Sequence, residues 1–267
     1  MLSEIILRSR EKIGIMIEAE VIKPESLAGK SKEEIEGLLL WQGSERLPLS
    51  RFFDVELKGS PSSSPEETHV LMQGDFSRVK RIGEGMKAGS MEIDGPAGMH
   101  LGAEMAGGSI LVKGDAGSWS GREMKGGMLH IGGSCGDHVG SAYRGSWRGM
   151  TGGQIIIEGN ARSQLGGGLV GGQITVGGNV ENFCGIRQSG GLILVKGSAV
   201  RGVGAEMNGG TIAVCQHILQ PSPGFVEMAR EESPKAGEVQ LEGRYVKFSG
   251  DYALSKNPKG TLYCREV

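Results

Sequence analysis

The stretch Met105-Ala-Gly-Gly-Ser-Ile-Leu-Val-Lys-Gly114 decides the fold, because close copies of it recur along the chain. The copy that begins at Met124 reads MKGGMLHIGG, and the copy that begins at Met150 reads MTGGQIIIEG. Further copies, of which the earliest is degraded, begin at Met86, Leu169, Gln188 and Met207. Successive copies begin 19 residues apart, except that 26 residues separate Met124 from Met150. The chain is therefore predicted to be built from a 19-residue structural repeat, with seven residues inserted into one unit.

Each copy carries two apolar residues separated by one position, such as Ile110 and Val112 or Ile155 and Ile157. A period of two with β-branched residues indicates a strand that buries one face. A further glycine stands sixteen residues after each of the first six starts, at Gly102, Gly121, Gly140, Gly166, Gly185 and Gly204. Two glycines per unit disfavour a helix and mark corners of the chain. Each unit is therefore predicted to form about three short strands joined by three corners.

A single unit has no interior, so the units must stack and share one column of apolar side chains. This predicts an all-β fold, a right-handed parallel β-helix of about seven to eight 19-residue coils. Equivalent residues should then form ladders, with isoleucines inside, methionines at the repeat starts and short polar residues at one corner, namely Asp115, Ser134, Asn160, Asn179 and Ser198. A left-handed hexapeptide helix needs a multiple of six residues, and a calcium-binding nonapeptide roll needs an aspartate that is missing here.

The repeat is absent from both ends of the chain, so we expect three units. Residues 1–64 should form one or two strands and, after the capping box at Ser31 to Glu34, a short helix near 31–40. Residues 65–216 should form the β-helix. Residues 217–267 read as strands separated by turns. The simplest role for both flanks is to cap the exposed strand edges of the stack.

Composition limits the classes of function. Of 267 residues, 48 are glycine, and 29 basic and 31 acidic side chains give a net charge of −2. This balance does not indicate a nucleic-acid or membrane partner. The four cysteines form no CxxC pair, and such isolated thiols suit a reducing cytosol. The first residues mix charged and apolar types and read neither as a signal peptide nor as a transmembrane helix.

Candidate chemistry is sparse. His100, Trp119 and His138 occupy equivalent positions, so Trp119 should stack between two histidines that lie too far apart to share one metal ion. The carboxylates of Glu104, Glu123 and Glu206 should point outward into water. Two cysteines, Cys135 and Cys184, should fill the core. No P-loop appears, and no glycine-rich dinucleotide-binding motif stands in a βαβ setting. We therefore expect no catalytic, cofactor-binding or metal-binding residue in this chain.

The inserted segment Ser141-Ala-Tyr-Arg-Gly-Ser-Trp-Arg-Gly149 is the exception. It concentrates Tyr143, Arg144, Trp147 and Arg148, the residue types enriched where proteins bind one another. Insertions in repeat proteins often mark the binding face. The segment 141–149 is therefore a candidate partner-contact loop. In the alternative, it folds back on the stack, and Trp147 covers Met150.

Three segments resemble a known family. The sequence SAYRGSWRGMTGG at 141–153, the sequence GDAGSWSGREMKGG at 114–127 and the sequence IKPESLAGKSKEEIEGL at 22–38 resemble the C subunit of formylmethanofuran dehydrogenase. The resemblance runs over most of the chain. The repeat alone is also similar to the C-terminal solenoid domain of glutamate synthase.

The first resemblance implies a cytoplasmic complex of methanogenic archaea that reduces CO2 and attaches the formyl group to methanofuran, the first step of methanogenesis from CO2. It implies these partners: a molybdenum or tungsten pterin subunit that reduces CO2, an amidohydrolase-like subunit with a dinuclear metal site, a small pterin-associated subunit, and ferredoxin-like subunits with iron–sulfur clusters. The chain itself would be a non-catalytic scaffold within this oxidoreductase.

Other functions stay open at this point. A methylotroph formyltransferase/hydrolase complex uses a similar subunit, and glutamate synthase uses a similar structural module. A stand-alone carbohydrate-active β-helix would need a cluster of acidic side chains on one face, whereas the outward columns here are mixed and rich in glycine.

Overall fold

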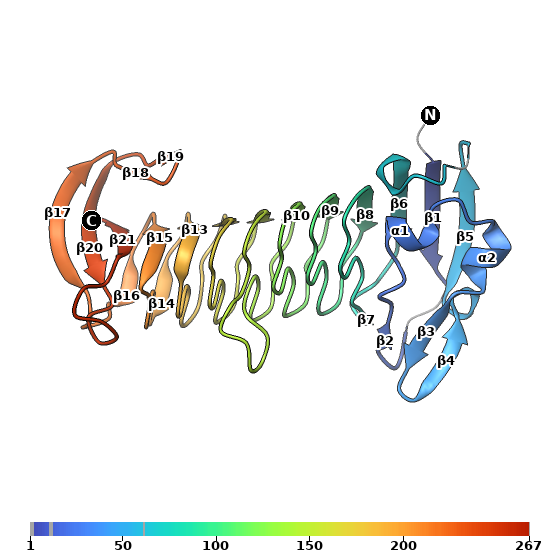
Figure 1. The fold of residues 1–267 in the computed structure, drawn as a ribbon, viewed down its shortest axis with the longest axis horizontal. Coiled ribbons are helices and arrows are strands. Elements are labelled where there is room, and N and C mark those ends of the chain that lie inside the picture. The colour runs from blue at the N-terminus through green and yellow to red at the C-terminus, as the bar shows by residue number, and fades with distance from the viewer. Residues whose placement is uncertain (1–2, 11–12, 61, 267) are drawn as a thin grey trace.

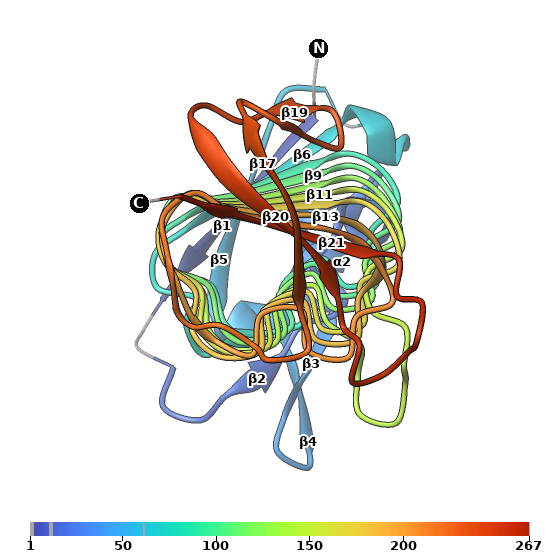
Figure 2. The same cartoon turned by 90° about the vertical axis from the view of Figure 1, so that its left-hand side faces the viewer.

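The computed structural model describes residues 3–10, 13–60 and 62–266. Strands dominate these residues and the few helices are short, so the all-β class expected from the sequence is confirmed. Figure 1 shows an elongated row of stacked turns with a strand-rich cap at each end. Figure 2, along the row, shows that successive turns nearly superimpose.

One strand from each repeat joins a long sheet. These strands are β8 (Ser90–Asp94), β9 (Ser109–Val112), β10 (Met128–Ile131), β11 (Gln154–Ile157), β12 (Gln173–Val176), β13 (Ser189–Val195) and β15 (Gly209–Val214). Neighbouring strands are parallel, and Ile155 pairs with Ile174, which in turn pairs with Ile193. Leu129 pairs with Ile155 across the insertion, so the extra residues do not shift the register.

The interior is the column that the repeat predicts. The paired isoleucines and valines have essentially no exposed surface, and neither do the methionines that begin the repeats. Glycine is required where these side chains approach the opposite wall. Gly121 has φ +62°, and a Cβ atom on it would lie 2.5 Å from Cδ1 of Ile155. The close packing of the stack therefore depends on glycine at this position.

The expectation of three strands per unit is wrong for most of the stack. The long sheet forms one side of the stack. On a second side, equivalent residues of successive turns form only single parallel bridges, which run from Phe76 through Ala97, Ala116, Cys135, Ala161 and Val180 to Ala199. Regular pairing on that side occurs only between β14 (Ala199–Arg201) and β16 (Ile218–Gln220) within the described residues. The third side is made of turns. Every second residue there, such as Trp119, Gly121 and Glu123, has a positive φ and so lies in the left-handed region. A chain that turns at every second residue cannot extend as a strand.

The polar ladder is present at the predicted corner. The side chain of Asp115 accepts a hydrogen bond from the Ser134 amide at 2.7 Å, and Ser134 accepts one from the Asn160 amide at 3.1 Å. The ladder continues in the same way: the Asn160 side chain accepts a hydrogen bond from the Asn179 amide, and the Asn179 side chain accepts one from the Ser198 amide. Each side chain thus satisfies a backbone donor of the next turn.

The N-terminal end covers the first turn. Strand β6 (Thr68–Gln73) pairs with β8 and with β1 (Ser3–Ser9), and β1 pairs antiparallel with β5 (Phe53–Lys58). The remaining elements are β2 (Ile17–Glu18), α1 (Pro24–Leu27), α2 (Lys32–Glu36), β3 (Leu39–Gln42), β4 (Glu45–Pro48), β7 (Val79–Lys80) and the 3₁₀ turns Leu49–Arg51 and Pro65–Glu67. The capping box at Ser31 is formed, but α2 ends before Gly37 because Leu39 begins a strand, so the predicted helix 31–40 was too long.

The C-terminal end closes the other edge. Strand β21 (Gly260–Arg265) pairs with β15, and β20 (Arg244–Gly250) and β17 (Val226–Glu232) follow antiparallel. The hairpin of β18 (Lys235–Ala236) and β19 (Val239–Gln240) lies over the outer face of the sheet, where Leu241 and Tyr245 pack with Leu192 and Leu194.

None of the helices in the described ranges has the length and apolar character needed to cross a lipid bilayer.

Candidate functional site at the inserted loop

The inserted residues leave the stack through a narrow neck and protrude from one side (Figures 1 and 2). The Met150 amide donates to the Gly140 carbonyl at 3.0 Å, so the chain closes on itself before the next repeat begins. The Ala142 amide donates to Gly167 and the Gly149 amide to Gly168, both at 2.8 Å. The neck is thus tied to the following turn, which explains how the repeat resumes in register.

Aromatic rings line the turn side of the stack beside the loop. The Trp119 ring lies between His100 and His138, with centroid distances of 6.2 and 4.0 Å and nearly parallel planes. The stacking predicted for these three equivalent residues is therefore present. Tyr143 of the loop meets the Trp119 ring edge-on at 5.5 Å. One of the four candidate contact residues thus packs on the stack.

A buried arginine lies beneath Tyr143. Arg122 is only 7% exposed, and its guanidinium lies 4.4 Å from the Tyr143 ring centroid. Its Nη2 atom contacts Glu104 at 3.0 Å and Glu84 at 3.3 Å, and its Nη1 atom contacts Glu123 at 3.5 Å. A buried guanidinium needs such partners.

The expectation that the glutamate column simply faces water is therefore wrong for Glu104 and Glu123, which are partly buried against Arg122. Glu123 also accepts a hydrogen bond from the Tyr143 amide at 3.1 Å, so it helps to position the loop. Glu206 is exposed as expected, and it pairs with Arg187 at 2.8 Å.

The other three candidate residues face outward. Trp147 is 70% exposed, and the guanidinium of Arg187 lies 4.6 Å from its ring centroid. Arg144 and Arg148 are exposed. The Trp147 ring is therefore not buried against the stack.

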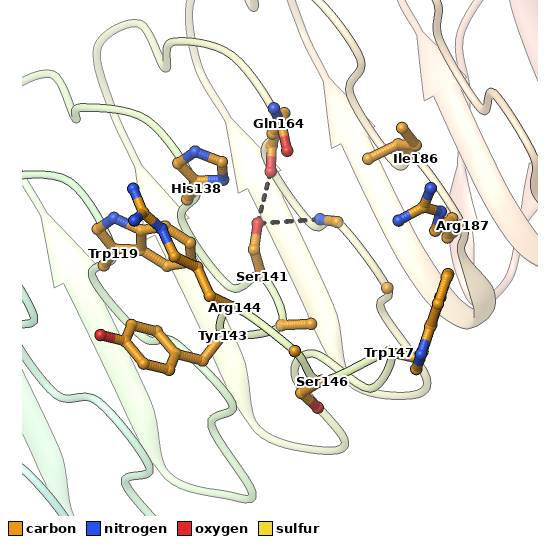
Figure 3. Close-up of a pocket in the computed structure, with 14 residues that line it drawn as sticks. Trp119, His138, Ser141, Tyr143, Arg144, Ser146, Trp147, Gln164, Ile186 and Arg187 are labelled. Atoms are coloured by element: carbon orange, nitrogen blue, oxygen red, sulfur yellow. Dashed lines mark hydrogen bonds between the residues drawn. The ribbon is translucent and has the colours of Figure 1, made fainter.

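A cavity of about 360 Å³ separates the loop from the stack (Figure 3). Figure 3 shows Trp119, His138 and Arg144 on one side and Trp147 and Arg187 on the other. Between them Ser141 donates a hydrogen bond to the Gln164 carbonyl at 2.5 Å and accepts one from the Gly167 amide at 3.1 Å. The hydroxyl of Ser141 is therefore committed to holding the backbone.

Burial controls the protonation of the groups nearby. It lowers the pKa of His138, and burial together with Arg122 lowers the pKa of His100. Both rings are therefore neutral near pH 7. Burial raises the pKa of the Cys135 and Cys184 thiols to about 12, so neither supplies a thiolate nucleophile. The cysteines fill the core, as expected from the sequence.

Sequence reasoning missed Arg122, Arg187 and Glu84. A signal was present for Arg187, because Glu206 follows it by 19 residues and so lies on the next turn. Among the described residues, no group of three or more His, Cys, Asp or Glu side chains is placed to hold a metal ion.

The in-register parallel stack with one inserted aromatic loop defines an all-β repeat protein, and no protein-family model matches it. Over 100 residues the chain is 58% identical to the C subunit of the molybdenum-containing formylmethanofuran dehydrogenase 1 of Methanosarcina barkeri, a match that covers 38% of this chain and 33% of that protein. Over 101 residues it is 41% identical to the C subunit of the tungsten-containing formylmethanofuran dehydrogenase 2 of Methanothermobacter wolfeii, a match that covers 38% and 37%. The matched part thus spans about a third of the length of these relatives.

A solved structure is similar over nearly the whole chain. It is a chain of the formyltransferase/hydrolase complex from Methylorubrum extorquens in complex with methylofuran, with a TM-score of 0.82 and 27% identity. The match covers 98% of this chain and 100% of that one. The resemblance to the C subunit of formylmethanofuran dehydrogenase that the motifs indicated is therefore confirmed.

Proposed function

We propose that this chain is a non-catalytic structural subunit of a formylmethanofuran dehydrogenase complex, which reduces CO2 and fixes it on methanofuran. The observation that carries the proposal is the 58% identity over 100 residues to the C subunit of such an enzyme. The relatives include a molybdenum and a tungsten form, so the pterin metal of the complex is either of these. As its resemblance implies, the complex would lie in the cytoplasm.

The fold supports a structural role. Backbone hydrogen bonds run from turn to turn along the stack, so the sheet presents a long and rigid face. Permanent complexes commonly bury thousands of Å² on such faces. We propose that the stack is a right-handed parallel β-helix, with units at 1–64, 65–216 and 217–267. Catalysis would then reside in the pterin-binding, amidohydrolase-like, small pterin-associated and ferredoxin-like partners.

The inserted loop is the proposed site of contact with one partner. Tyr143 is held on the Trp119 stack, whereas Trp147, Arg144 and Arg148 project from it. Exposed tryptophan and arginine side chains on a supported loop are typical of binding hot spots. Replacing Trp147 with alanine should leave the unfolding transition unchanged and weaken assembly. If Trp147→Ala unfolds the stack instead, the loop serves stability and not contact.

A second candidate is the equivalent subunit of a methylotroph formyltransferase/hydrolase complex. The observation in its favour is the structural match over nearly the entire chain. The two candidates differ in their partners, because the resemblance implies a CO2-reducing pterin subunit only for the dehydrogenase. The similarity of the repeat to glutamate synthase stays a prediction from the repeat alone.

Purification of the tagged chain from its native cells tests the proposal. Native mass spectrometry should find the chain in a large assembly with an amidohydrolase-like subunit. Molybdenum or tungsten and iron should be present in the assembly and absent from the chain once it is separated. A chain that purifies alone would contradict the proposal, and an assembly without a pterin subunit would favour the methylotroph candidate.

A further inference from the structure

The inserted loop carries unusual charge for this chain. Residues 141–149 contain two arginines and no acidic residue, although the whole chain has a net charge of −2. Neither Arg144 nor Arg148 forms an ion pair with a carboxylate of the described residues. By contrast, Arg122 and Arg187 beside the loop are both paired with glutamates. Two cations thus remain available to a carboxylate from outside.

The cavity behind the loop can accept an inserted group. Its volume of about 360 Å³ lies at the small end of the range of ligand pockets, ~300–1,000 Å³. Two arginines line it: Arg187 lies against the Trp147 ring and is already paired with Glu206, whereas Arg144 lies on the opposite side of the cavity in Figure 3. Arginine binds carboxylates with two parallel hydrogen bonds, so the cavity fits a side chain that ends in a carboxylate.

The loop is also prepared for binding. The neck bonds of Ala142 and Gly149 fix its two ends, and the bond from the Tyr143 amide to Glu123 fixes its first turn. A loop that is ordered before binding loses less conformational entropy when the partner arrives. This favours tight contact by few residues.

The exposed ring of Trp147 indicates which class of molecule occupies the cavity. A small free anion would neutralise the arginines but would leave Trp147 70% exposed. A polypeptide can cover the indole with an apolar residue while it places a neighbouring carboxylate beside Arg144. We propose that the cavity and the inserted loop receive an acidic segment of a partner subunit, with an aspartate or glutamate directed at Arg144, the arginine of the cavity wall that has no carboxylate partner among the described residues. This inference rests on the proposed function, because it names the chemistry of the partner that the loop contacts.

Binding measurements with matched variants test the inference. The remaining subunits of the complex are immobilised, and the purified full chain is bound to them at several salt concentrations. The double variant Arg144→Glu/Arg148→Glu should weaken binding about 100-fold and flatten its dependence on salt. The control Arg162→Glu/Arg201→Glu makes the same change of charge at exposed positions that do not line the cavity, and it should change affinity little. Circular dichroism checks that both variants fold.

The outcomes separate the two proposals. If the wild-type chain does not bind the other subunits, the proposed function fails and this inference fails with it. If the wild-type chain binds and both double variants lose affinity equally, only this inference is overturned.

A second measurement identifies the occupant directly. Replacing Trp147 with a photoreactive phenylalanine analogue and irradiating the assembled complex should cross-link the loop to one partner peptide. We expect that peptide to carry more acidic than basic residues close to the cross-linked position. A cross-link to a basic or uncharged segment would overturn the inference.

Discussion

At the scale of single residues, the backbone of the turns is the most demanding feature. On the turn side of the stack, left-handed residues alternate with others, as at Trp119, Gly121 and Glu123. The residue sixteen positions after the start is left-handed and is glycine in all six turns that begin at Met86 to Gln188. The flanking positions accept residues such as Trp119 and Glu123. An L residue in this conformation costs about 1–2 kcal/mol. In five of the six turns this position also lacks space, because an added Cβ atom would lie 2.4–2.7 Å from an isoleucine or methionine side chain.

Two glycines allow the cost of a left-handed backbone to be measured separately from the cost of a crowded side chain. Gly121 and Gly145 both have positive φ, but an added Cβ atom would lie 2.5 Å from Ile155 at the first and meets nothing within 4 Å at the second. We expect Gly145→Ala to lower the free energy of unfolding by about 1 kcal/mol and Gly121→Ala by about 3 kcal/mol. Urea denaturation of both variants measures this. Equal losses would mean that the interior adapts to the extra methyl group.

The histidines of the ring stack predict a dependence on pH. Burial lowers the folded-state pKa of His100 and His138 below the usual value of about 6.5, so the unfolded chain binds protons more readily. Their contribution to stability is therefore complete above pH 6.5 and is lost as the pH falls through the lowered pKa values. When His100 is protonated, its positive charge is also repelled by the guanidinium of Arg122.

The variant His100→Phe/His138→Phe keeps aromatic rings in the stack and removes both titrating groups. Phenylalanine suits this position, because Phe183 occupies it in a later turn with φ 60°. We expect the free energy of unfolding of the variant to fall less than that of the wild type between neutral and mildly acidic pH. His217→Phe, at an exposed position, is the control. If the wild type and the double variant lose stability in parallel, the two histidines do not titrate as described.

At the scale of elements, each strand of the stack has one face in the core. Ile157 is fully buried, whereas Ile156 next to it in β11 is only partly buried on the outer face. We expect Ile157→Asp to destabilise the chain by several kcal/mol, because it buries an unpaired charge. Ile156→Asp should cost far less. Thermal unfolding of the two variants compares them, and similar losses would contradict the assigned strand faces.

The strands were predictable because their alternation and the 19-residue spacing are both written in the sequence. The pairing of Ile155 with Ile174 and the ladder from Asp115 to Ser198 follow from spacing alone. The number of strands per turn did not follow, because glycines indicate corners without indicating how much extended chain lies between them. Left-handed residues such as Trp119 convert a potential third strand into turns.

The loop was predictable as an interruption of the repeat, and its composition indicated contact residues. The ion cluster at Arg122 was not predictable in the same way. Glu84 and Glu104 reach this guanidinium from other turns, and such contacts depend on the direction in which each side chain leaves its corner. The 19-residue spacing predicts which residues lie above one another in the stack. It does not predict which of their side chains turn inward.

At the scale of the whole molecule, the stack has the difficulty that each end exposes a row of unpaired backbone groups. The last repeat strand, β15, avoids this because residues Thr211 to Val214 pair with Thr261 to Cys264 of β21. The sheet continues through β20 to β17, whose outer strand carries ion pairs of Arg230 with Glu227 and Glu266. Charged side chains at a sheet edge discourage pairing with another copy.

Removal of this cap should therefore change the association state and not merely the stability. A chain that ends at residue 216 leaves the β15 edge open and exposes the apolar surface that Leu262 and Tyr263 cover. We expect it to form dimers or larger species as its concentration rises, because open edges pair with one another. Light scattering after size-exclusion chromatography measures the mass.

The matched control deletes residues 142–148, which restores the spacing of 19 between repeats and leaves both ends capped. This variant should keep the association state of the full-length chain at every concentration, since it removes a protrusion and opens no edge. The comparison assigns self-association to the sheet edge rather than to chain shortening in general. If the chain that ends at residue 216 keeps a single-copy mass at all concentrations, the C-terminal strands do not act as a cap, and their place in the sheet would have to serve partner binding instead.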